Sequence, residues 1–339
     1  MQQSCAPYIR GVSNLETRPR EAVCGAQPPG EVVTELLEPR KVWLGKTTQV
    51  RRLLPHKDRR MVGAWCFVDH YGPDDIRDRQ GMFVPPHPHT GLQTVSWLFD
   101  GEVLHRDSVG SEALVRPGEL NLMTAGDGIA HSEESPGEHD PILHGVQLWV
   151  ALPDADRRTA APAFAQHRDL PVLELPGLRA TVLIGEVAGV RSPATSFTPL
   201  VGAEVSLQPG TPATLPLTPE HEYAVLVVDG PVTVQGEILD RGQMLYVGRD
   251  RGHLEMAAVD RGRLMLLGGE PFEERLVMWW NFIARTHEEI VEAREQWMAG
   301  LAAGRDERFG VVEGFDGAPL PAPEMPGVRL RARGRTRED

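Results

Sequence analysis

Short runs of strand-forming residues, each closed by turn residues, recur through most of this 339-residue sequence. The run at 92–99 ends at Asp100-Gly101, the run at 112–115 is followed by Pro117-Gly118, and the run at 120–124 leads into a glycine-rich turn. Short strands spaced by turn signals every eight to twelve residues or so are typical of β-sandwiches and barrels. A parallel α/β sheet would need helices between its strands. The sequence therefore predicts an all-β protein.

This strand pattern occurs twice, which predicts two β-barrels in one chain, a size that suits two domains. We expect a first barrel over residues 36–155 and a second barrel with a terminal helix over 156–304, joined by a connection rich in proline and arginine. The segments 1–35 and 305–339 lack periodicity and are expected to be flexible extensions. The strand-like runs of the second half are 178–185, 203–207, 221–228, 231–234, 243–247, 254–258 and 263–267.

A helix is expected after the second barrel. Thr286 and Glu289 have the spacing of a capping box, and Gly300 lies near the expected end. Apolar residues at helical spacing define one face. We interpret the tryptophans around this helix as core packing, because large aromatic side chains mainly supply buried area. The apolar positions are Ile290, Ala293, Trp297 and Leu301, and the tryptophans are Trp279, Trp280 and Trp297.

Two pairs of polar residues have a spacing that could bring their side chains together in one site. His87 and His89 form one pair, and His131 and Glu133 form the other. Residues two apart in a strand point to the same face, so two neighbouring strands would bring these four side chains together. An H-x-H pair alone is weak evidence, but the intervening meander can return His131 to His89. Three imidazoles and one carboxylate suit a mononuclear transition metal and leave positions open for other ligands.

Other features limit the alternatives for this site. Cys5, Cys24 and Cys66 are scattered and show no C-x-x-C spacing, which argues against a thiolate zinc site. In the second half, His221 and Glu222 are adjacent, so they point to opposite faces of a strand. We therefore expect the second barrel to hold no metal.

Several residues near the histidine pairs have two possible roles. His105 and Asp107 share a face and could support the metal ligands or form a surface pair. Four large side chains could line an apolar mouth beside the ion or belong to the core, and the sequence does not decide between these. They are Trp65, Phe83, Trp97 and Met123.

The overall charge is −13, which disfavours contact with phosphate backbones. We expect no direct nucleic-acid binding. No apolar run is long enough to span a membrane, the first residues lack the pattern of a secretory signal, and the three cysteines suit a reducing cytoplasm. A basic run near the C-terminus is interpreted as a solvated tail rather than a site for nucleic acid or an acidic partner. It comprises Arg329, Arg331, Arg333, Arg335 and Arg337.

Over roughly residues 38–300, the chain resembles the pirin family of the cupin superfamily. The resemblance lies in HPHTGLQTVSWLFDGEVLHRDS (87–108), PGELNLMTAGDGIAHSEES (117–135), HGVQLWVALP (144–153) and GGEP (268–271). Carried over position by position, the family's metal ligands fall on His87, His89, His131 and Glu133. The family usually has Glu where this chain has Gln93, a change that we expect to affect substrate contacts rather than metal binding.

The resemblance implies a bicupin, an all-β fold of two cupin-type β-barrels with a C-terminal helix. It also implies one divalent metal ion in the first barrel, foremost Fe(II), with Cu, Mn, Ni or Zn as alternatives. Several pirins open the flavonol quercetin with O₂, and others regulate protein partners. We therefore expect a cytoplasmic dioxygenase acting on a small aromatic substrate, with Glu133 also accepting the substrate's proton. The alternative is a metal-binding regulator that acts through protein contacts, and fold alone does not choose between them.

Overall fold

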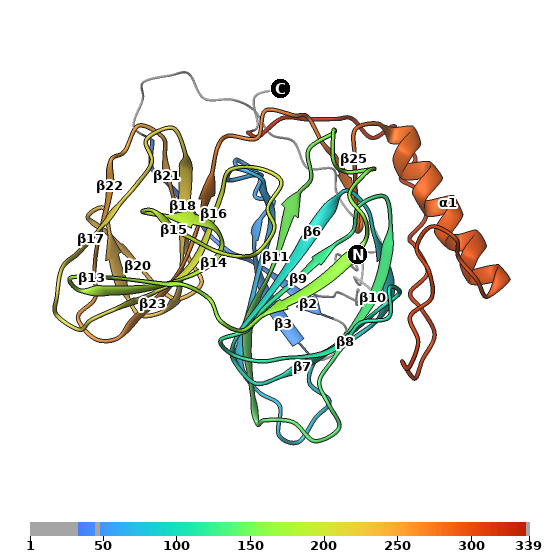
Figure 1. The fold of residues 1–339 in the computed structure, drawn as a ribbon, viewed down its shortest axis with the longest axis horizontal. Coiled ribbons are helices and arrows are strands. Elements are labelled where there is room, and N and C mark those ends of the chain that lie inside the picture. Colours follow the sequence, from blue (N-terminus) through green and yellow to red (C-terminus); the bar gives the residue numbers. More distant parts are fainter. Residues whose placement is uncertain (1–32, 45–47, 337–339) are drawn as a thin grey trace, which may run out of the picture.

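The computed structural model describes residues 33–44 and 48–336 and shows two β-barrels packed side by side (Figure 1). The all-β prediction is confirmed, and the one helix among these described residues lies near the C-terminus. Within the described residues, no helix has the length and apolar character that a membrane crossing requires.

The first barrel is built from a larger and a smaller antiparallel sheet. In the larger sheet the strand order is β12-β9-β6-β11-β4-β3-β2, and in the smaller it is β5-β10-β7-β8. The strands of the larger sheet are β2 (Arg40–Leu44), β3 (Thr48–Leu54), β4 (Trp65–Asp75), β6 (Leu92–Asp100), β9 (Leu120–Thr124), β11 (Ile142–Ala151) and β12 (Ala163–His167). Those of the smaller sheet are β5 (Phe83–His89), β7 (Val103–Asp107), β8 (Glu112–Val115) and β10 (Ile129–Glu134).

The second barrel repeats this plan. Its larger sheet has the order β1-β21-β18-β23-β16-β14-β13, with β15 paired to β14, and its smaller sheet has the order β17-β22-β19-β20. The larger sheet contains β1 (Glu35–Leu37), β13 (Val172–Leu175), β14 (Leu178–Val187), β15 (Val190–Arg191), β16 (Leu200–Leu207), β18 (Glu222–Asp229), β21 (Met244–Gly248) and β23 (Gly262–Gly269). The smaller sheet contains β17 (Ala213–Pro216), β19 (Val232–Val234), β20 (Glu237–Leu239) and β22 (His253–Ala257).

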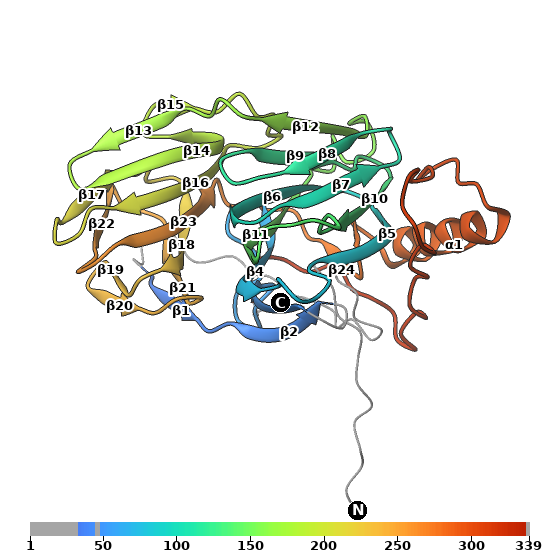
Figure 2. The same ribbon diagram turned by 90° about the horizontal axis from the view of Figure 1, so that it is seen from below.

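Each barrel has one edge strand that the order of the chain would assign to the other barrel or to a linker. Strand β1 precedes the first barrel but pairs with β21 of the second, with Leu36 opposite Leu245. Strand β12 follows the first barrel's last core strand and still pairs with β9, with Phe164 opposite Met123. Figure 2 shows β1 and β2 separating toward different barrels. The expected domain boundaries at 36 and 155 therefore do not separate the strands by the barrel to which they belong. Pairing with a strand that is distant in the sequence leaves no local pattern from which to predict it.

The two barrels share one hydrophobic core, which includes residues from both. Two tryptophans of the first barrel reach across to the second. The indole N–H of Trp65 donates to the carbonyl of Val201 over 2.9 Å, and that of Trp97 donates to the Glu204 carboxylate over 2.7 Å. These bonds satisfy polar atoms that burial would otherwise leave unpaired, and they place Trp65 and Trp97 at the interface between the barrels.

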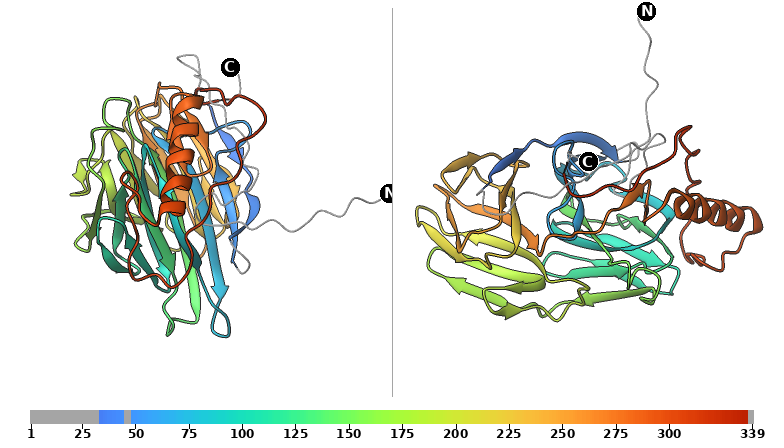
Figure 3. Two further views of the ribbon diagram at one scale, coloured as in Figure 1. Left: turned by 90° about the vertical axis from the view of Figure 1, so that its right-hand side faces the viewer. Right: turned by 90° about the horizontal axis from the view of Figure 1, so that it is seen from above.

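The hairpin β24 (Val277–Trp279) and β25 (Phe282–Ala284) leads into α1 (His287–Ala303), which lies outside the first barrel (Figures 1 and 3). The capping box of Thr286 and Glu289 is present as predicted, and the helix ends at Gly304 in a left-handed conformation. The tryptophans predicted as core packing are buried. The hairpin joins the first barrel through a hydrogen bond from Ile283 N–H to the Thr90 carbonyl over 3.0 Å.

The segment after the helix docks on the barrels, unlike the flexible tail that we expected. Phe309 and Leu330 are buried, and Arg335 is 5% exposed. Arg335 lies 2.9 Å from the carboxylate of Glu222 in the second barrel. The anchoring residues occur singly between polar residues, so they produce no periodicity in the sequence. The extension expected over 1–35 falls almost entirely outside the described residues.

Candidate metal centre

The two histidine pairs lie on neighbouring antiparallel strands of the smaller sheet. Strand β5 carries His87 and His89, and strand β10 carries His131 directly opposite His87. Beyond this point the register shifts, so that Glu133 lies opposite Val84. Three residues of β5 therefore span two of β10, which places a bulge at Pro85-Pro86. Proline has no N–H for a sheet ladder and is tolerated at such edge positions and bulges.

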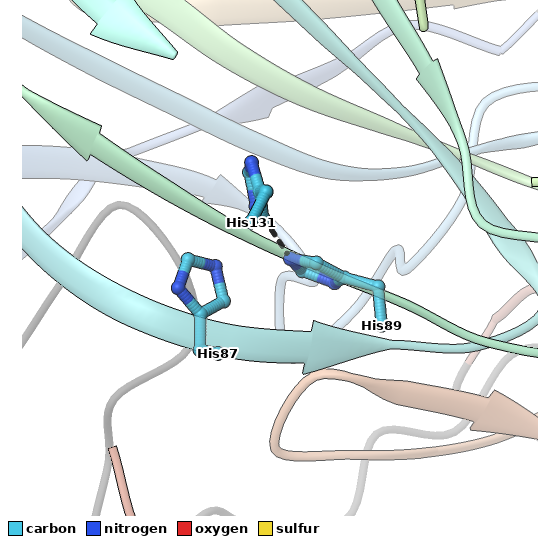
Figure 4. A group of neighbouring side chains, drawn as sticks. All are labelled: His87, His89 and His131. Carbon is cyan, nitrogen blue, oxygen red and sulfur yellow. Dashed lines mark hydrogen bonds between the residues drawn. The ribbon is translucent and has the colours of Figure 1, made fainter. Parts of the chain in front are cut away.

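The three histidines converge as the sequence predicted (Figure 4). Each of their rings offers a nitrogen that lies within 4.8 Å of the other two. The Nε2 atoms of His89 and His131 are 3.0 Å apart and share a hydrogen bond. The ring of His87 lies 4.4 Å from that of His131, centroid to centroid. Two strands are therefore enough to gather three imidazoles around one point.

Burial keeps these imidazoles in the neutral form that binds metals. His87, His89 and His131 are all fully buried. Burial lowers the pKa of His87 to about 4. Burial also holds the pKa values of His89 and His131 well below the ordinary value, and neighbouring histidines lower them further. Neutral histidine has a free ring nitrogen at physiological pH, which is what a metal requires.

Glu133 follows on the same face of β10 but stands apart from the three-histidine group. It is 3% exposed, and burial raises the pKa of Glu133 to about 7, against the opposing effects of Ser96 and Gln147. Its Oε1 atom lies 3.4 Å from the Ser96 hydroxyl, which donates mainly to Gln147 at 2.7 Å. Its Oε2 atom is buried and has no hydrogen-bond partner among the described residues. An unpaired buried carboxylate oxygen is costly unless something binds it.

A second layer of polar residues orients the histidines. His105 and Asp107 are buried, on the strand opposite Glu133 and His131. The Nδ1 atoms of His105 and His131 are 3.4 Å apart, and His105 Nε2 lies 3.1 Å from the Asp107 carboxylate. His87 Nδ1 lies 2.8 Å from the Pro85 carbonyl, to which it donates. Such contacts fix ring orientation and tautomer in metal sites, so the His105–Asp107 pair is a buried support rather than a surface pair.

The carboxylate of Asp107 is itself anchored by the chain. It accepts hydrogen bonds from the N–H groups of Val109 at 3.0 Å and Ser111 at 2.9 Å. Burial raises the pKa of Asp107, but the bonds from His105 and Ser111 outweigh burial and the net pKa is lowered. An ionised Asp107 can therefore hold His105 in place.

Gln93 lies outside the histidine group. It is fully buried on β6, and its amide donates to the Thr124 hydroxyl over 3.0 Å and to the Thr195 carbonyl over 3.2 Å. The Thr195 contact ties Gln93 to the loop between β15 and β16 of the second barrel. Its Oε1 atom has no partner among the described residues.

The sequence did not single out Trp149, although its ring lies 5.1 Å from that of His89 in an edge-on arrangement. Trp149 also stacks on Phe67 at 4.1 Å, which ties the site to the shared core. Its position on β11, far from β5 in sequence, leaves no local signal.

The structure decides between the two roles considered for four large side chains. Trp65, Trp97 and Met123 belong to the shared core, and Phe83 packs on Phe315 at 5.2 Å.

The donor set fits a divalent transition metal. Buried, neutral imidazoles with converging nitrogens suit Fe, Cu, Ni and Zn, and the unpaired Oε2 of Glu133 adds a carboxylate within the same barrel. Fold and site together define a two-barrel cupin protein whose first barrel carries a histidine cluster that could hold a metal ion.

Comparison with known proteins places the chain more closely. The family described as Pirin matches residues 47–150, and the Pirin C-terminal cupin domain matches 202–303. The chain belongs to the pirin family. A pirin-like protein of Caulobacter vibrioides is 40% identical over 74% of this chain and 88% of its own length.

Two further relatives carry the name of an enzyme. A Pseudomonas aeruginosa protein, provisionally named a quercetin 2,3-dioxygenase, is 43% identical over 84% of this chain and 88% of its own length. The crystal structure of quercetin 2,3-dioxygenase from Acinetobacter baumannii superposes with a TM-score of 0.83 at 42% identity, covering 88% of this chain and 97% of that one. The resemblance inferred from the sequence is thus confirmed for family and fold.

Proposed function

We propose that His87, His89, His131 and Glu133 hold one divalent metal ion, foremost Fe(II), with Cu, Mn, Ni and Zn as alternatives. The observation that carries this proposal is the convergence of three buried imidazoles, with all pairs of ligand atoms within 4.8 Å. The buried Oε2 of Glu133 supports its inclusion, because this atom has no hydrogen-bond partner in the part of the chain that the structure describes. Four protein ligands on an octahedral ion leave two positions open.

We propose further that the protein is a dioxygenase that opens a flavonol such as quercetin with O₂. The named activity of the two quercetin 2,3-dioxygenases supports this choice of substrate. An ion held at this site would supply a Lewis acid and bring the two reactants together.

The chain's own residues have distinct tasks in this reaction. The histidines present neutral nitrogens, while the Asp107–His105 contact holds the ring of His131 in place. The Glu133 carboxylate, whose Oε2 is buried, would accept the proton of the substrate hydroxyl when it is released from the ion. The full burial of the three histidines limits contact with water, which strengthens electrostatic interactions at the site.

Oxygen uptake by the purified, full-length protein tests this proposal. With iron or copper bound, we expect aerobic loss of quercetin, with one O₂ consumed and carbon monoxide released as the ring opens. His89→Ala should abolish turnover together with metal binding. His253→Ala, an exposed histidine on β22, is the matched control and should have no effect.

Gln93 provides a second test of the reaction. If a carboxylate near the substrate limits the rate, Gln93→Glu should raise turnover without changing metal content. A fully metallated protein that consumes no oxygen, as the native chain and as Gln93→Glu, would refute the dioxygenase proposal and favour a regulatory metal protein.

A further inference from the structure

Two polar side chains of the larger sheet point into the first barrel, toward the histidine cluster. Ser96 on β6 and Gln147 on β11 are direct partners in the sheet ladder, and both are buried. Gln147 lies two residues before Trp149, so these two side chains share a face of β11. The ring of Trp149 lies 5.1 Å from that of His89. Ser96 and Gln147 therefore belong to the barrel interior that contains the three histidines.

These two side chains reach Glu133, which comes from the smaller sheet on the other side of the barrel. The oxygen of the Ser96 hydroxyl lies 2.7 Å from Oε1 of Gln147 and 3.4 Å from Oε1 of Glu133. The other carboxylate oxygen of Glu133, Oε2, is buried and makes no hydrogen bond among the described residues. The two oxygens of this carboxylate therefore differ, because Oε1 contacts Ser96 whereas Oε2 is left for another partner.

The donors and acceptors of the three side chains suit a carboxylate that must be held in place. An ionised carboxylate only accepts, a hydroxyl donates one proton and also accepts, and an amide offers both a donor and an acceptor. The Ser96 hydroxyl donates to the Gln147 oxygen, at the shorter of its two distances. A half-turn of the Gln147 amide exchanges its oxygen and nitrogen. The amide then donates to the hydroxyl, and the hydroxyl is free to donate to Oε1 of Glu133.

We infer that Ser96 and Gln147 form a positioning pair for Glu133. Their hydrogen bonds hold Oε1 and leave Oε2 for an ion at the histidine cluster. Residues that orient a metal ligand in this way usually contribute about 10- to 100-fold to metal affinity. The inference rests on the proposed function, because it takes Glu133 as one of the ligands.

Metal affinity tests the positioning pair without any need for turnover, and Co²⁺ is the probe. In the full-length protein, Ser96→Ala and Gln147→Met should each raise the dissociation constant for Co²⁺ by about 10- to 100-fold, as measured by competition with a chelator. Methionine is close to glutamine in length but has no N–H to donate. The visible absorption of bound Co²⁺ reports on the ligands around the ion, and it should change in both variants.

A double-mutant cycle shows whether the positioning pair acts through Glu133. Glu133→Ala should itself weaken Co²⁺ binding, and adding Ser96→Ala to it should cause almost no further loss, because the hydroxyl no longer has its target. Ser192→Ala is the matched control and should leave Co²⁺ binding unchanged. Ser192 is a buried serine of the second barrel, and its hydroxyl donates to the Leu183 carbonyl over 2.6 Å. Thermal unfolding of the metal-free proteins checks that all variants remain folded.

The outcomes separate this inference from the proposed function. Native Co²⁺ affinity in Ser96→Ala and Gln147→Met, together with weak binding in Glu133→Ala, would overturn the inference alone. An equal loss from Ser96→Ala with and without Glu133 would also overturn it, because the effect would then be a general one on the barrel. Native affinity in Glu133→Ala would remove Glu133 from the proposed ligand set, and the positioning pair would lose its role with it.

Discussion

In the first barrel, the strand pair β5–β10 places His87 opposite His131, whereas the pair β17–β22, at the same position of the second barrel, places Leu215 opposite Leu254. Both leucines lie in an aliphatic core. The same strand order thus accommodates either a polar centre or a dry interior. The barrel fold does not depend on the imidazoles, so they are free to serve a ligand.

The first barrel also contains more buried polar side chains than the second. Among described residues 178–269, the buried polar side chains are Ser192 and Glu222, whereas the first barrel buries its histidines, Glu133, Asp107 and many others. Buried polar groups add little stability unless they are paired. The first barrel therefore holds most of the buried polar groups from which a reactive centre could be built, whereas the second has a mainly apolar interior.

Among the variants that test this difference between the barrels, removal of one histidine should have the largest effect, a loss of bound metal. In His131→Ala, metal content should fall from about one ion per chain to nearly none, because one of three converging nitrogens is lost. Elemental analysis of protein purified without an affinity tag measures this. One ion retained in His131→Ala, or an ion in residues 178–267, would break the comparison.

Arg335→Ala should cause the largest loss of stability. It would leave the buried carboxylate of Glu222 without its cation, which costs about 3–5 kcal/mol of unfolding free energy. Glu222 also accepts from the Gly63 N–H and the Tyr246 hydroxyl, so it cannot turn toward solvent. Urea denaturation measures the change, with the exposed Arg329→Ala as control. Equal stability of the two variants would show that the tail is dispensable.

Matched substitutions at the equivalent strand positions sharpen the comparison directly. Leu254→Ala should cost about 2–5 kcal/mol by opening a cavity and should leave metal content unchanged. His131→Leu should remove the metal but alter the unfolding free energy of metal-free protein by no more than about 1.5 kcal/mol. If His131→Leu unfolds the metal-free protein, the fold of the first barrel does depend on this imidazole and the comparison is wrong.

The first barrel should also be the more sensitive to acid. His70 and His144 are buried with their Nε2 atoms 2.9 Å apart, and burial lowers the pKa of His144 to about 4. In the unfolded chain His144 takes up a proton near pH 6.5, whereas in the folded chain it does so only near pH 4. Its contribution to the free energy of unfolding is therefore fully present above pH 6.5 and is lost as the pH falls toward 4. The full shift is worth about 3 kcal/mol.

His144→Gln should flatten this dependence, as measured by urea unfolding between pH 7 and pH 5. The control His253→Gln, on the surface of the second barrel, should not. An identical pH dependence in all three proteins would exclude the histidine pair as its source.

The smallest expected effect concerns the support of the ligands. His105→Ala should weaken metal binding by about 10- to 100-fold, the usual range for residues that orient a ligating histidine. Competition with a chelator measures this. His139→Ala, at a partly exposed histidine in the loop before β11, should change nothing. Unaltered affinity in His105→Ala would mean that the strands alone orient His131.

The sequence predicted the features that depend on local spacing. The i, i+2 pairs gave the histidine cluster, and Thr286 with Glu289 gave the helix start. It could not place Trp149 against His89 or assign β1 to the second barrel, because those contacts join residues far apart in the chain. The tail was misjudged for a related reason, since Phe309, Leu330 and Arg335 are isolated anchors without a period. Whether Glu133 ligates the ion stays a prediction.

The docking of the C-terminal segment has a consequence for biosynthesis. The Phe309 carbonyl accepts from the Ala130 N–H at 3.0 Å, and the Leu320 N–H donates to the Pro86 carbonyl at 2.8 Å. Strands β5 and β10 leave the ribosome early, yet the partners of their outer backbone groups are translated last. Domains usually fold in order of synthesis, but here the first barrel is synthesised first and can complete these contacts only after the C-terminal segment has been translated. Until then its exposed strand edge is open to pairing with other nascent chains.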